Sequence, residues 1–326
     1  MVRRAALVLV LVFAAACGSF QDESVVVDLR IIGMSADPPE QVVAFDINNP
    51  PPAVELLDQL VPTKVCALLA DPSFDRPLTY TFTLCLVNNG GRCDSDAQKV
   101  LSAGVLDDPD VTVPEPQLCT TVNPDGNLLG VLLESLDNDD FKGLGGVYYD
   151  VVLRVGSADF DPSLDLFGDK ALRVMPKIPD TVTANHNPTI DHFEASIDGG
   201  DPVTLPLGRC VEQTAPYQLG TAQKVRLTPV EPPDARETYV APTIDGQGRT
   251  FTEALTYQWL VGAGGVTSAF SGGPRDIPGN PAPLFTDYKT PSADDVPEAT
   301  DVPLWIIQRD ERLGVHWYES CVRVVP

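Results

Sequence analysis

The sequence predicts an all-β fold, and three observations support this prediction. Proline makes up 31 of the 326 residues, and such frequent prolines interrupt helices because proline lacks the backbone N–H and clashes with the preceding turn. Short runs alternate between apolar and polar residues, as half-buried strands do. No long helical segments alternate with these runs. Hydrophobic residues are 43% of the chain, enough to bury cores, so wholesale disorder is excluded.

Two segments show the alternation most clearly. Residues 78–86 place Leu78, Tyr80 and Phe82 on one side and threonines on the other, and residues 147–153 repeat the same period of two. Proline and glycine residues lie between segments of this kind and end them. The other predicted strands are 25–34, 65–69, 189–196, 223–227, 255–261, 303–309 and 315–324, and the best helix candidate is 126–136.

The two halves of the sequence repeat one another. Three short segments of the first half recur in the second half in the same order. The matching segments are 64–72 with 224–232, 78–82 with 255–259, and 172–176 with 322–326. The boundary between the halves falls near Pro176, before a polar and proline-broken stretch at 177–180. We therefore expect two domains, at 25–176 and 180–326.

The second half resembles an immunoglobulin-like or PKD-like domain. The resemblance rests on Tyr257-Gln258-Trp259, the glycine pair at 264–265, and the segments 305–310 and 314–317. It implies that Trp259 fills the core from the third strand of a β-sandwich, with Phe82 as its smaller counterpart in the first half. The Gly-Asp-Gly of PKD-like domains is missing after the tryptophan. The expected fold class is all-β, with two tandem immunoglobulin-like β-sandwich domains, and this fold implies no particular function.

The beginning of the chain resembles a bacterial lipoprotein leader. Arg3 and Arg4 precede an apolar run at 5–16, which is shorter than the roughly 20 residues that a membrane-spanning helix needs. Ala14-Ala15-Ala16-Cys17 resembles the lipobox of these proteins, although leucine is commoner than alanine at the position of Ala14. The alternative is an ordinary cleaved signal peptide followed by a chance cysteine.

The lipobox resemblance implies that residues 1–16 are cleaved as a signal peptide and that Cys17 receives a diacylglycerol and an acyl chain such as palmitate. Gly18, in place of an aspartate after the cysteine, implies the outer membrane. Residues 17–24 then form a tether, and lipid is the only expected membrane attachment. Residues 25–40, with their Asp-Pro-Pro-Glu turn, resemble myxobacterial-type surface lipoproteins. We expect a lipid-anchored envelope protein whose body faces the periplasm or the cell surface.

Six cysteines remain once Cys17 is assigned to the lipid, and an even number outside the cytoplasm predicts disulfides. The four cysteines of the first half allow three connectivities. An Asn-Gly turn at 89–90 favours a bond across a hairpin between the two cysteines that flank it. On this basis the pairs are Cys85 with Cys93, Cys66 with Cys119, and Cys210 with Cys321. A metal or redox site is the alternative, but the sequence has no Cys-x-x-Cys.

Acidic residues outnumber basic residues by 46 to 22, and the net charge of −24 becomes −26 if Arg3 and Arg4 are cleaved. Nucleic-acid binding needs a basic face, so this class of protein is excluded. The densest acidic cluster holds Asp137, Asp139 and Asp140, a weak calcium candidate because calcium prefers several oxygens from one loop. The alternative is a solvated loop, and the EF-hand pattern is not met.

No sequence motif indicates an enzyme. The chain has three histidines, His186, His192 and His316, and lacks His-Glu-x-x-His, Gly-x-Ser-x-Gly and a P-loop. His186 and His192 are too few for a closed zinc site, so we expect them to be exposed. The segment 270–281 is rich in glycine and proline and predicts a long loop, a frequent position for binding residues.

The sequence therefore predicts a lipid-anchored cell-envelope protein with a non-catalytic binding or structural role toward an envelope protein or a polysaccharide. The first alternative is a calcium- or glycan-dependent adhesin module. The second is a secreted hydrolase whose catalytic residues meet only in the fold. We expect no cofactor beyond the lipid on Cys17.

Overall fold

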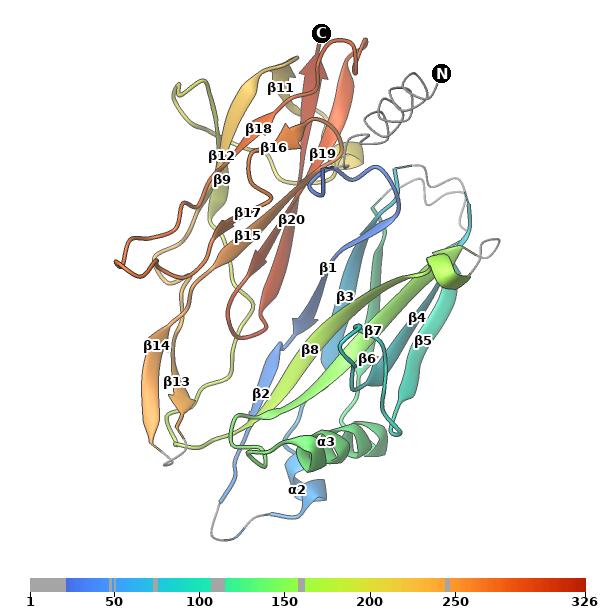
Figure 1. The fold of residues 1–326 in the computed structure, drawn as a ribbon, viewed down its shortest axis with the longest axis vertical. Helices are drawn as coiled ribbons and strands as arrows, with labels where there is room; N and C mark the ends of the chain where they lie inside the picture. Colours follow the sequence, from blue (N-terminus) through green and yellow to red (C-terminus); the bar gives the residue numbers. More distant parts are fainter. Residues whose placement is uncertain are drawn as a thin grey trace, which may run out of the picture.

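The computed structural model describes residues 22–46, 49, 51–72, 76–106, 115–157, 162–243 and 247–326. The predicted signal peptide and Cys17 lie outside these residues. Most of the regular structure described is β-strand, arranged in several sheets, so the predicted all-β class is confirmed. Figure 1 shows strands β1–β8 in the lower part of the view and most of β9–β20 in the upper part, with β13 and β14 at the lower left. We call these two groups of strands the N-terminal half and the C-terminal half.

The N-terminal half has two sheets. The first has the order β1 (Arg30–Asp37), β3 (Thr63–Ala70) and β6 (Gln117–Val122), and the second has the order β2 (Glu40–Val43), β8 (Leu166–Pro176), β7 (Val147–Ser157), β4 (Leu78–Cys85) and β5 (Lys99–Leu106). Pro38 and Pro39 separate β1 from β2. Because proline has no N–H to donate to a sheet, the chain leaves the first sheet there and enters the second. Helix α2 (Ala53–Leu57), helix α3 (Gly126–Asn138) and the short helix η1 (Pro162–Leu164) lie in the connections.

The C-terminal half has the same plan with shorter strands. Its first sheet has the order β10 (Val203–Thr204), β9 (His192–Ile197), β12 (Lys224–Val230), β18 (Thr286–Lys289) and β16 (Gly265–Val266). Its second sheet has the order β11 (Tyr217–Gly220), β20 (Val315–Val325), β19 (Thr300–Arg309), β15 (Thr256–Val261) and β17 (Phe270–Gly272). A separate hairpin of β13 (Thr238–Pro242) and β14 (Gly248–Thr252) and the short helix η2 (Cys210–Glu212) complete it.

The strand orders of the two halves correspond. The series β1-β3-β6 matches β9-β12-β18, and β2-β8-β7-β4-β5 matches β11-β20-β19-β15-β17. In both halves the first strand of the second sheet is an edge strand that runs parallel to the last strand of that half. The last strand pairs antiparallel with its other neighbour, β7 in one half and β19 in the other. The three repeated segments of the sequence lie on the matching pairs β3 and β12, β4 and β15, and β8 and β20. Each half is therefore an immunoglobulin-like pair of sheets.

Each half encloses its own hydrophobic core between its two sheets. Phe82 of β4 is 0% exposed and Trp259 of β15 is 1% exposed, and they occupy matching strands. Both aromatic side chains therefore hold the core position that the sequence assigned to them. Phe193 of β9 contacts Trp259 edge-to-face at 6.0 Å between ring centroids, an arrangement that aromatic pairs favour.

A third cluster of buried side chains lies between the halves. It combines residues of β1 and β3 with residues of β15, β19 and β20, so the outer faces of two sheets pack together. Its members are Val26, Ile32, Leu68, Ala70, Leu260, Trp305, Ile307 and Val315, with Trp317 packed against them. Trp305 is buried in this interface and not between the two sheets of one half.

A buried group of charges also joins the halves, and we call it the inter-half ion cluster. Glu40 of β2 has no exposed side-chain surface and binds Arg312, in the turn between β19 and β20, at 2.6 Å from Nη2 to Oε1. The second carboxylate oxygen of Glu40 accepts from Nε of Arg173 on β8 at 2.6 Å. The backbone N–H of Asn185 donates to Glu40 at 3.1 Å. The opposite charges and the hydrogen bonds around Glu40 thus offset the cost of burying its carboxylate away from water.

Two segments differ from the predicted division of the chain. Ser24 and Val26, expected in the tether and the first domain, are buried, and the N–H of Val26 donates to the carbonyl of Val261 on β15 at 2.9 Å. Asn185, which follows the predicted boundary, is buried as well. Ser24, in the predicted tether, and Asn185, in the predicted second domain, are therefore both packed against the other half. No helix among the described residues is long and apolar enough to cross a membrane.

Candidate functional site

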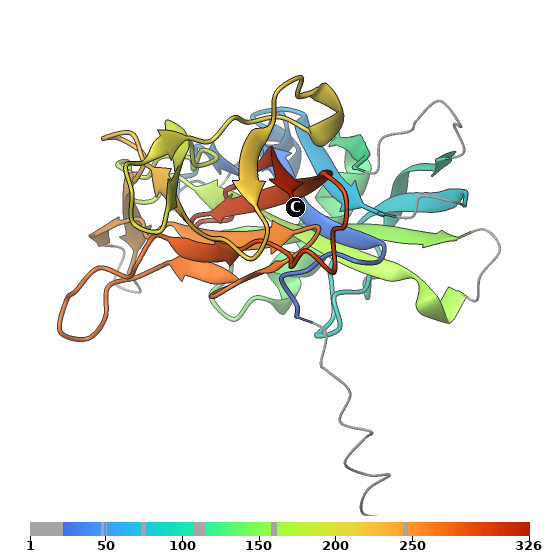
Figure 2. The same cartoon turned by 90° about the horizontal axis from the view of Figure 1, so that it is seen from above.

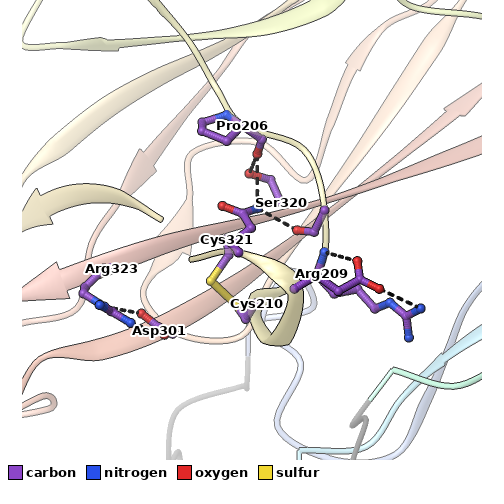
Figure 3. Close-up of a disulfide and its surroundings, with 10 residues drawn as sticks. Pro206, Arg209, Cys210, Asp301, Ser320, Cys321 and Arg323 are labelled. Atoms are coloured by element: carbon purple, nitrogen blue, oxygen red, sulfur yellow. Dashed lines mark hydrogen bonds and ion pairs between the residues drawn. A yellow bond between two sulfur atoms is a disulfide. The ribbon is translucent and has the colours of Figure 1, made fainter. Parts of the chain in front are cut away.

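The three disulfides of the structure are the three pairs derived from the sequence. Cys66 bonds Cys119 between the neighbouring strands β3 and β6, so this bond lies within one sheet and does not join the two sheets as in antibody domains. The Cys85–Cys93 bond closes the hairpin after β4. Figure 3 shows the third bond, which ties η2 to β20 through Cys210 and Cys321. All six side chains have structural roles.

The histidines form no metal site. His186 pairs with Glu237 at 2.7 Å from Nδ1 to Oε1, and His192 pairs with Asp191 at 2.9 Å. His186 and His316 are exposed as expected, whereas His192 is half-buried. Across the described residues, no group of three or more His, Cys, Asp or Glu side chains is arranged to hold a metal ion.

The acidic cluster that we considered for calcium stabilises a loop. Both carboxylate oxygens of Asp139 accept backbone hydrogen bonds, from the N–H of Phe141 at 3.2 Å and from the N–H of Gly143 at 2.6 Å. The carbonyl of Asp137 accepts from the ammonium of Lys142 at 3.1 Å. Asp140 is exposed. This loop, residues 139–146, follows α3, and we call it the lip because it borders the pocket described next.

An apolar pocket lies at the lower end of the molecule in Figure 1, where α2 and α3 cover the ends of β2, β7 and β8. Its volume is about 440 Å³, and it is partly open to solvent. Nearly all of the side chains that line it are apolar, and Lys142 is the single charged residue among the described residues of the lining. Our predictions from the sequence did not include this pocket.

Helix α3 forms because its residues provide both a cap and two apolar stripes. The Asp125 carboxylate accepts from the N–H groups of Asn127 and Leu128 at 2.9 and 3.2 Å, which satisfies free donors at the helix start and lowers the pKa of Asp125. One stripe, Leu128 and Val131, is buried in the core of the N-terminal half. The second stripe lines the pocket and consists of Leu129, Leu132, Leu133 and Leu136.

This second stripe is the signal from which the sequence could have predicted the pocket. A helix that covers a core needs one apolar face, and additional leucines at positions i, i+3, i+4 and i+7 indicate a second buried or binding face. The opposite wall comes from α2, which contributes Ala53, Leu56 and Leu57. Because α2 and α3 approach each other without closing, the walls leave a cavity between them.

The backbone of the lip turns tightly and adopts left-handed conformations that favour glycine. Gly143 and Gly146 have φ of 85° and 90°, and Lys142 has φ of 51°. A Cβ on Gly146 would lie 2.6 Å from the sulfur of Met175, so a larger residue would have to displace that side chain. Asp139 therefore holds a tightly turned segment that carries Phe141 and Leu144 to the pocket.

Two polar grooves lie between the halves. One has a volume of about 490 Å³ and the other of about 370 Å³, and Gln117, His316 and Trp317 line both of them. Glu319 borders the smaller groove, and its pKa is raised to about 7 by burial and by the nearby charge of Glu115, although Arg209 lowers it. Burial also raises the pKa of Glu115. The Glu319 carboxyl therefore holds a proton over part of the neutral pH range.

The predicted loop at 270–281 begins with the short strand β17 and continues as an exposed connection to β18. Figure 2, seen from above, shows this connection in orange, projecting from the side of the molecule. Ile277 at its tip is fully exposed. A single apolar side chain on a loop does not make a binding site, so the apolar pocket is the stronger candidate.

Comparisons with known proteins add little. No protein-family model matches the chain, and no curated protein matches it. Among solved structures, the C-terminal domain of the AgI/II polypeptide BspA of Streptococcus agalactiae aligns with 81% of this chain and 93% of its own, at 9% identity and a TM-score of 0.19. The native conformation of Escherichia coli alpha-2-macroglobulin aligns with 94% of this chain but only 17% of its own length, at 10% identity and a TM-score of 0.20. The assignment of the fold class therefore rests on the strand order of the sheets.

Proposed function

We propose that this chain is a lipid-anchored cell-envelope protein with a non-catalytic binding role, and that the apolar pocket is its binding site. The observation that carries the proposal is the partly open cavity of about 440 Å³ with an apolar lining. Ligand sites commonly have volumes of about 300–1,000 Å³ and mostly apolar walls. Leaving apolar surface in water costs about 25 cal/mol per Å², so an open cavity of this kind is better explained by an occupant than by stability.

The lining supports binding and not catalysis. The described residues of the lining include no carboxylate, histidine, serine or cysteine that could act as a nucleophile, acid or base. The ammonium of Lys142 is engaged by the carbonyl of Asp137. A polysaccharide would need polar partners for its hydroxyl groups, which this lining does not offer, so an apolar group of an envelope protein fits the pocket better.

The direction of the pocket fits a chain anchored through Cys17 in the outer membrane. The first described residues lie against the C-terminal half, where Val26 bonds Val261 of β15. In Figure 1, β15 and β16 lie well above the pocket helices α2 and α3. Cys17 precedes Asp22 by five residues, which span at most about 18 Å. A lipid on Cys17 would therefore leave the pocket directed away from the membrane, toward a partner in the envelope.

The anchor is tested by labelling. Cells that express the chain are grown with a labelled long-chain fatty acid, and the purified protein is assayed for covalent label. We expect the label in the natural chain and its loss in Cys17→Ser. Equal labelling of both proteins would contradict the lipid attachment.

The pocket is tested with an environment-sensitive apolar dye. We expect saturable, one-to-one binding with increased fluorescence, weakened by at least about tenfold in Leu133→Gln. Leu133 lines the pocket and is 44% exposed, so its substitution spares the core. The matched control is Val105→Gln on β5, because Val105 is 56% exposed and lies outside the pocket. Equal dye binding by the two variants would contradict the assigned site.

A further inference from the structure

We infer that the pocket receives a basic amphipathic helix of a partner protein, whose apolar side chains enter between α2 and α3 and whose lysine or arginine residues face the acidic rim. This inference rests on the proposed binding role of the pocket. It adds the chemistry of the occupant, and three features of the surface around the opening support it.

The first feature is that the apolar surface continues outside the cavity. Val54 on α2 is 59% exposed, Leu133 on α3 is 44% exposed and Phe141 on the lip is 61% exposed. A cavity for a small apolar molecule would close over its ligand, whereas these side chains extend the apolar surface beyond the opening. A partner that covers both the cavity and this border must itself present an extended apolar face.

The second feature is the shape of the opening. Its two walls are helices, with Leu56 and Leu57 of α2 on one side and Leu132 and Leu136 of α3 on the other. Grooves between helices accept amphipathic helices, whose apolar residues recur at i, i+3, i+4 and i+7. The spacing of the leucines on α3 has the same period, so such a helix can match it along several residues.

The third feature is the charge of the rim. Exposed carboxylates follow or precede the lining residues along the chain, namely Glu55 and Asp58 at α2, Asp137 at the end of α3 and Asp140 in the lip. Among the described residues, the basic ones in or next to the lining are fewer: they are Lys142, Lys177 and Arg173, and Arg173 is already paired with Glu40. The whole chain carries a net charge of −24. A basic partner is therefore attracted to this rim.

The same charges disfavour a free fatty acid or an anionic phospholipid. The headgroup of either ligand is negative and would lie beside Asp137 and Asp140. Binding such a headgroup needs several cationic side chains or a cluster of free N–H donors at the opening, and Lys142 is the single charged side chain in the described lining. Both carboxylate oxygens of Asp139 already occupy the N–H groups of Phe141 and Gly143. Of the two apolar occupants, a protein helix agrees better with the rim.

The experiment uses the full chain in phosphatidylcholine nanodiscs, with signals from empty nanodiscs subtracted. Two fluorescent peptides have leucines at the same helical positions, and all other positions are lysine in one and glutamate in the other. Binding is followed by fluorescence anisotropy at about 0.1 M and about 0.5 M salt. We expect the lysine peptide to bind at least about tenfold more tightly at low salt, with a smaller difference at high salt.

Variants separate the apolar and the charged contributions. We expect Leu133→Gln to weaken binding of the lysine peptide by at least about tenfold, and Val105→Gln to leave it unchanged. Phe141→Ser, at a second exposed position, gives an independent check on the apolar contact. The double variant Asp137→Asn and Asp140→Asn should reduce the preference for lysine over glutamate, because it removes two carboxylates from the rim.

The outcomes distinguish this inference from the proposed function. Equal affinity for the two peptides, or a preference that the double variant does not change, would overturn the basic partner. Displacement of the pocket dye by a long-chain fatty acid but by neither peptide would overturn it as well, while the binding role of the pocket would stand. Failure of the dye to bind the pocket at all would overturn the proposed function itself.

Discussion

The two halves of the molecule share one strand order but differ in the segments that connect the strands. In the N-terminal half, the connections from β2 to β3 and from β6 to β7 contain α2 and α3, which form the pocket. In the C-terminal half, the connection from β18 to β19 is a short loop. The difference shows that the sheets provide a common support, and that the inserted segments decide where a binding site can form.

The composition of the two corresponding connections explains the contrast. The segment before β7 contains the leucines of α3, and two of its residues, Leu128 and Val131, cover the end of the core. The segment 290–299 before β19 is polar and contains two prolines, so it forms no helix. There the buried residues are Thr290, Pro291 and Val296, of which Val296 belongs to the core of the C-terminal half. This segment therefore lacks the two apolar stripes of α3.

The C-terminal half has its own insertion, the hairpin β13–β14 between β12 and β15, and it serves the contact between the halves. Tyr239 and Phe251 stack at 5.6 Å across this hairpin. The guanidinium of Arg312, a member of the inter-half ion cluster, lies over Tyr239 at 4.7 Å. Thus the insertion in one half builds a pocket, and the insertion in the other supports the junction. The following predictions test this division of roles, from the largest expected effect to the smallest.

The disulfides should differ in their contribution to stability. Cys210 and Cys321 are 111 residues apart, whereas Cys85 and Cys93 are 8 residues apart. Because a longer loop restricts the unfolded chain more, replacing both cysteines by serine should cost about 5 kcal/mol for the long loop and about 2–3 kcal/mol for the hairpin. Denaturant unfolding of the two double variants measures the difference. A larger loss from the hairpin pair would contradict the loop-length argument.

The corresponding core aromatics test whether the halves unfold together. Phe82→Ala and Trp259→Ala should each reduce the free energy of unfolding by about 3–5 kcal/mol, because each leaves a cavity in a buried core. The third hydrophobic cluster joins the halves, so we expect both variants to lower the midpoint of the same calorimetric transition. Two separate transitions, of which each variant moves only one, would show that the halves are independent.

The inter-half ion cluster should be sensitive to the loss of one partner. Arg312→Met leaves the buried carboxylate of Glu40 with less compensation and should cost about 3–5 kcal/mol. The matched control is Arg323→Met, since Arg323 binds Asp301 at 2.7 Å in a more exposed pair, whose loss should cost far less. Similar losses in the two variants, measured by denaturant unfolding, would contradict the role assigned to burial.

Stability should fall as the pH rises from about 5 to about 8. The pKa of Glu319 is raised to about 7, as is that of Glu253, in both cases chiefly by burial. In this range the folded state binds more protons at these groups than the unfolded state, so rising pH favours unfolding. We expect a loss of about 2 kcal/mol in total. Calorimetry at both pH values checks this, with a smaller loss in Glu319→Gln; a Tm that rises toward pH 8 would contradict it.

The smallest effect concerns the lip. Asp139→Ala removes the acceptor for the N–H groups of Phe141 and Gly143 and should cost about 1 kcal/mol, with weaker binding of the pocket dye. Asp140→Ala, at the exposed neighbour, should leave both measurements nearly unchanged. If millimolar calcium raised the Tm and both substitutions abolished the rise, the acids would be calcium ligands and the capping role would be wrong.

The sequence predicted strands where alternation was regular and missed several others, among them β5, β6 and β8. Strand β6 was not predicted because Thr120, at a core-facing position, is polar although it is buried. The middle of β8 contains Lys170, which is buried although lysines are seldom inside. Its ammonium donates to the carbonyl of Leu313 in the C-terminal half, and burial lowers its pKa to about 8. That partner lies too far along the chain for any local pattern to indicate it.

The sequence by itself determined the all-β class, the repetition of short segments in the two halves, the core positions of Phe82 and Trp259, and helix α3. These features depend on periodicity and on residues close together in the chain, where the side-chain pattern follows the geometry of one element. Only the tertiary structure decided the pocket and the junction of the halves. The Glu40–Arg312 contact joins residues 272 positions apart, and the pocket needs α2 and α3 to approach without closing. Such contacts arise from packing between elements, and the sequence contains a local signal for only one wall of the pocket, the second leucine stripe of α3.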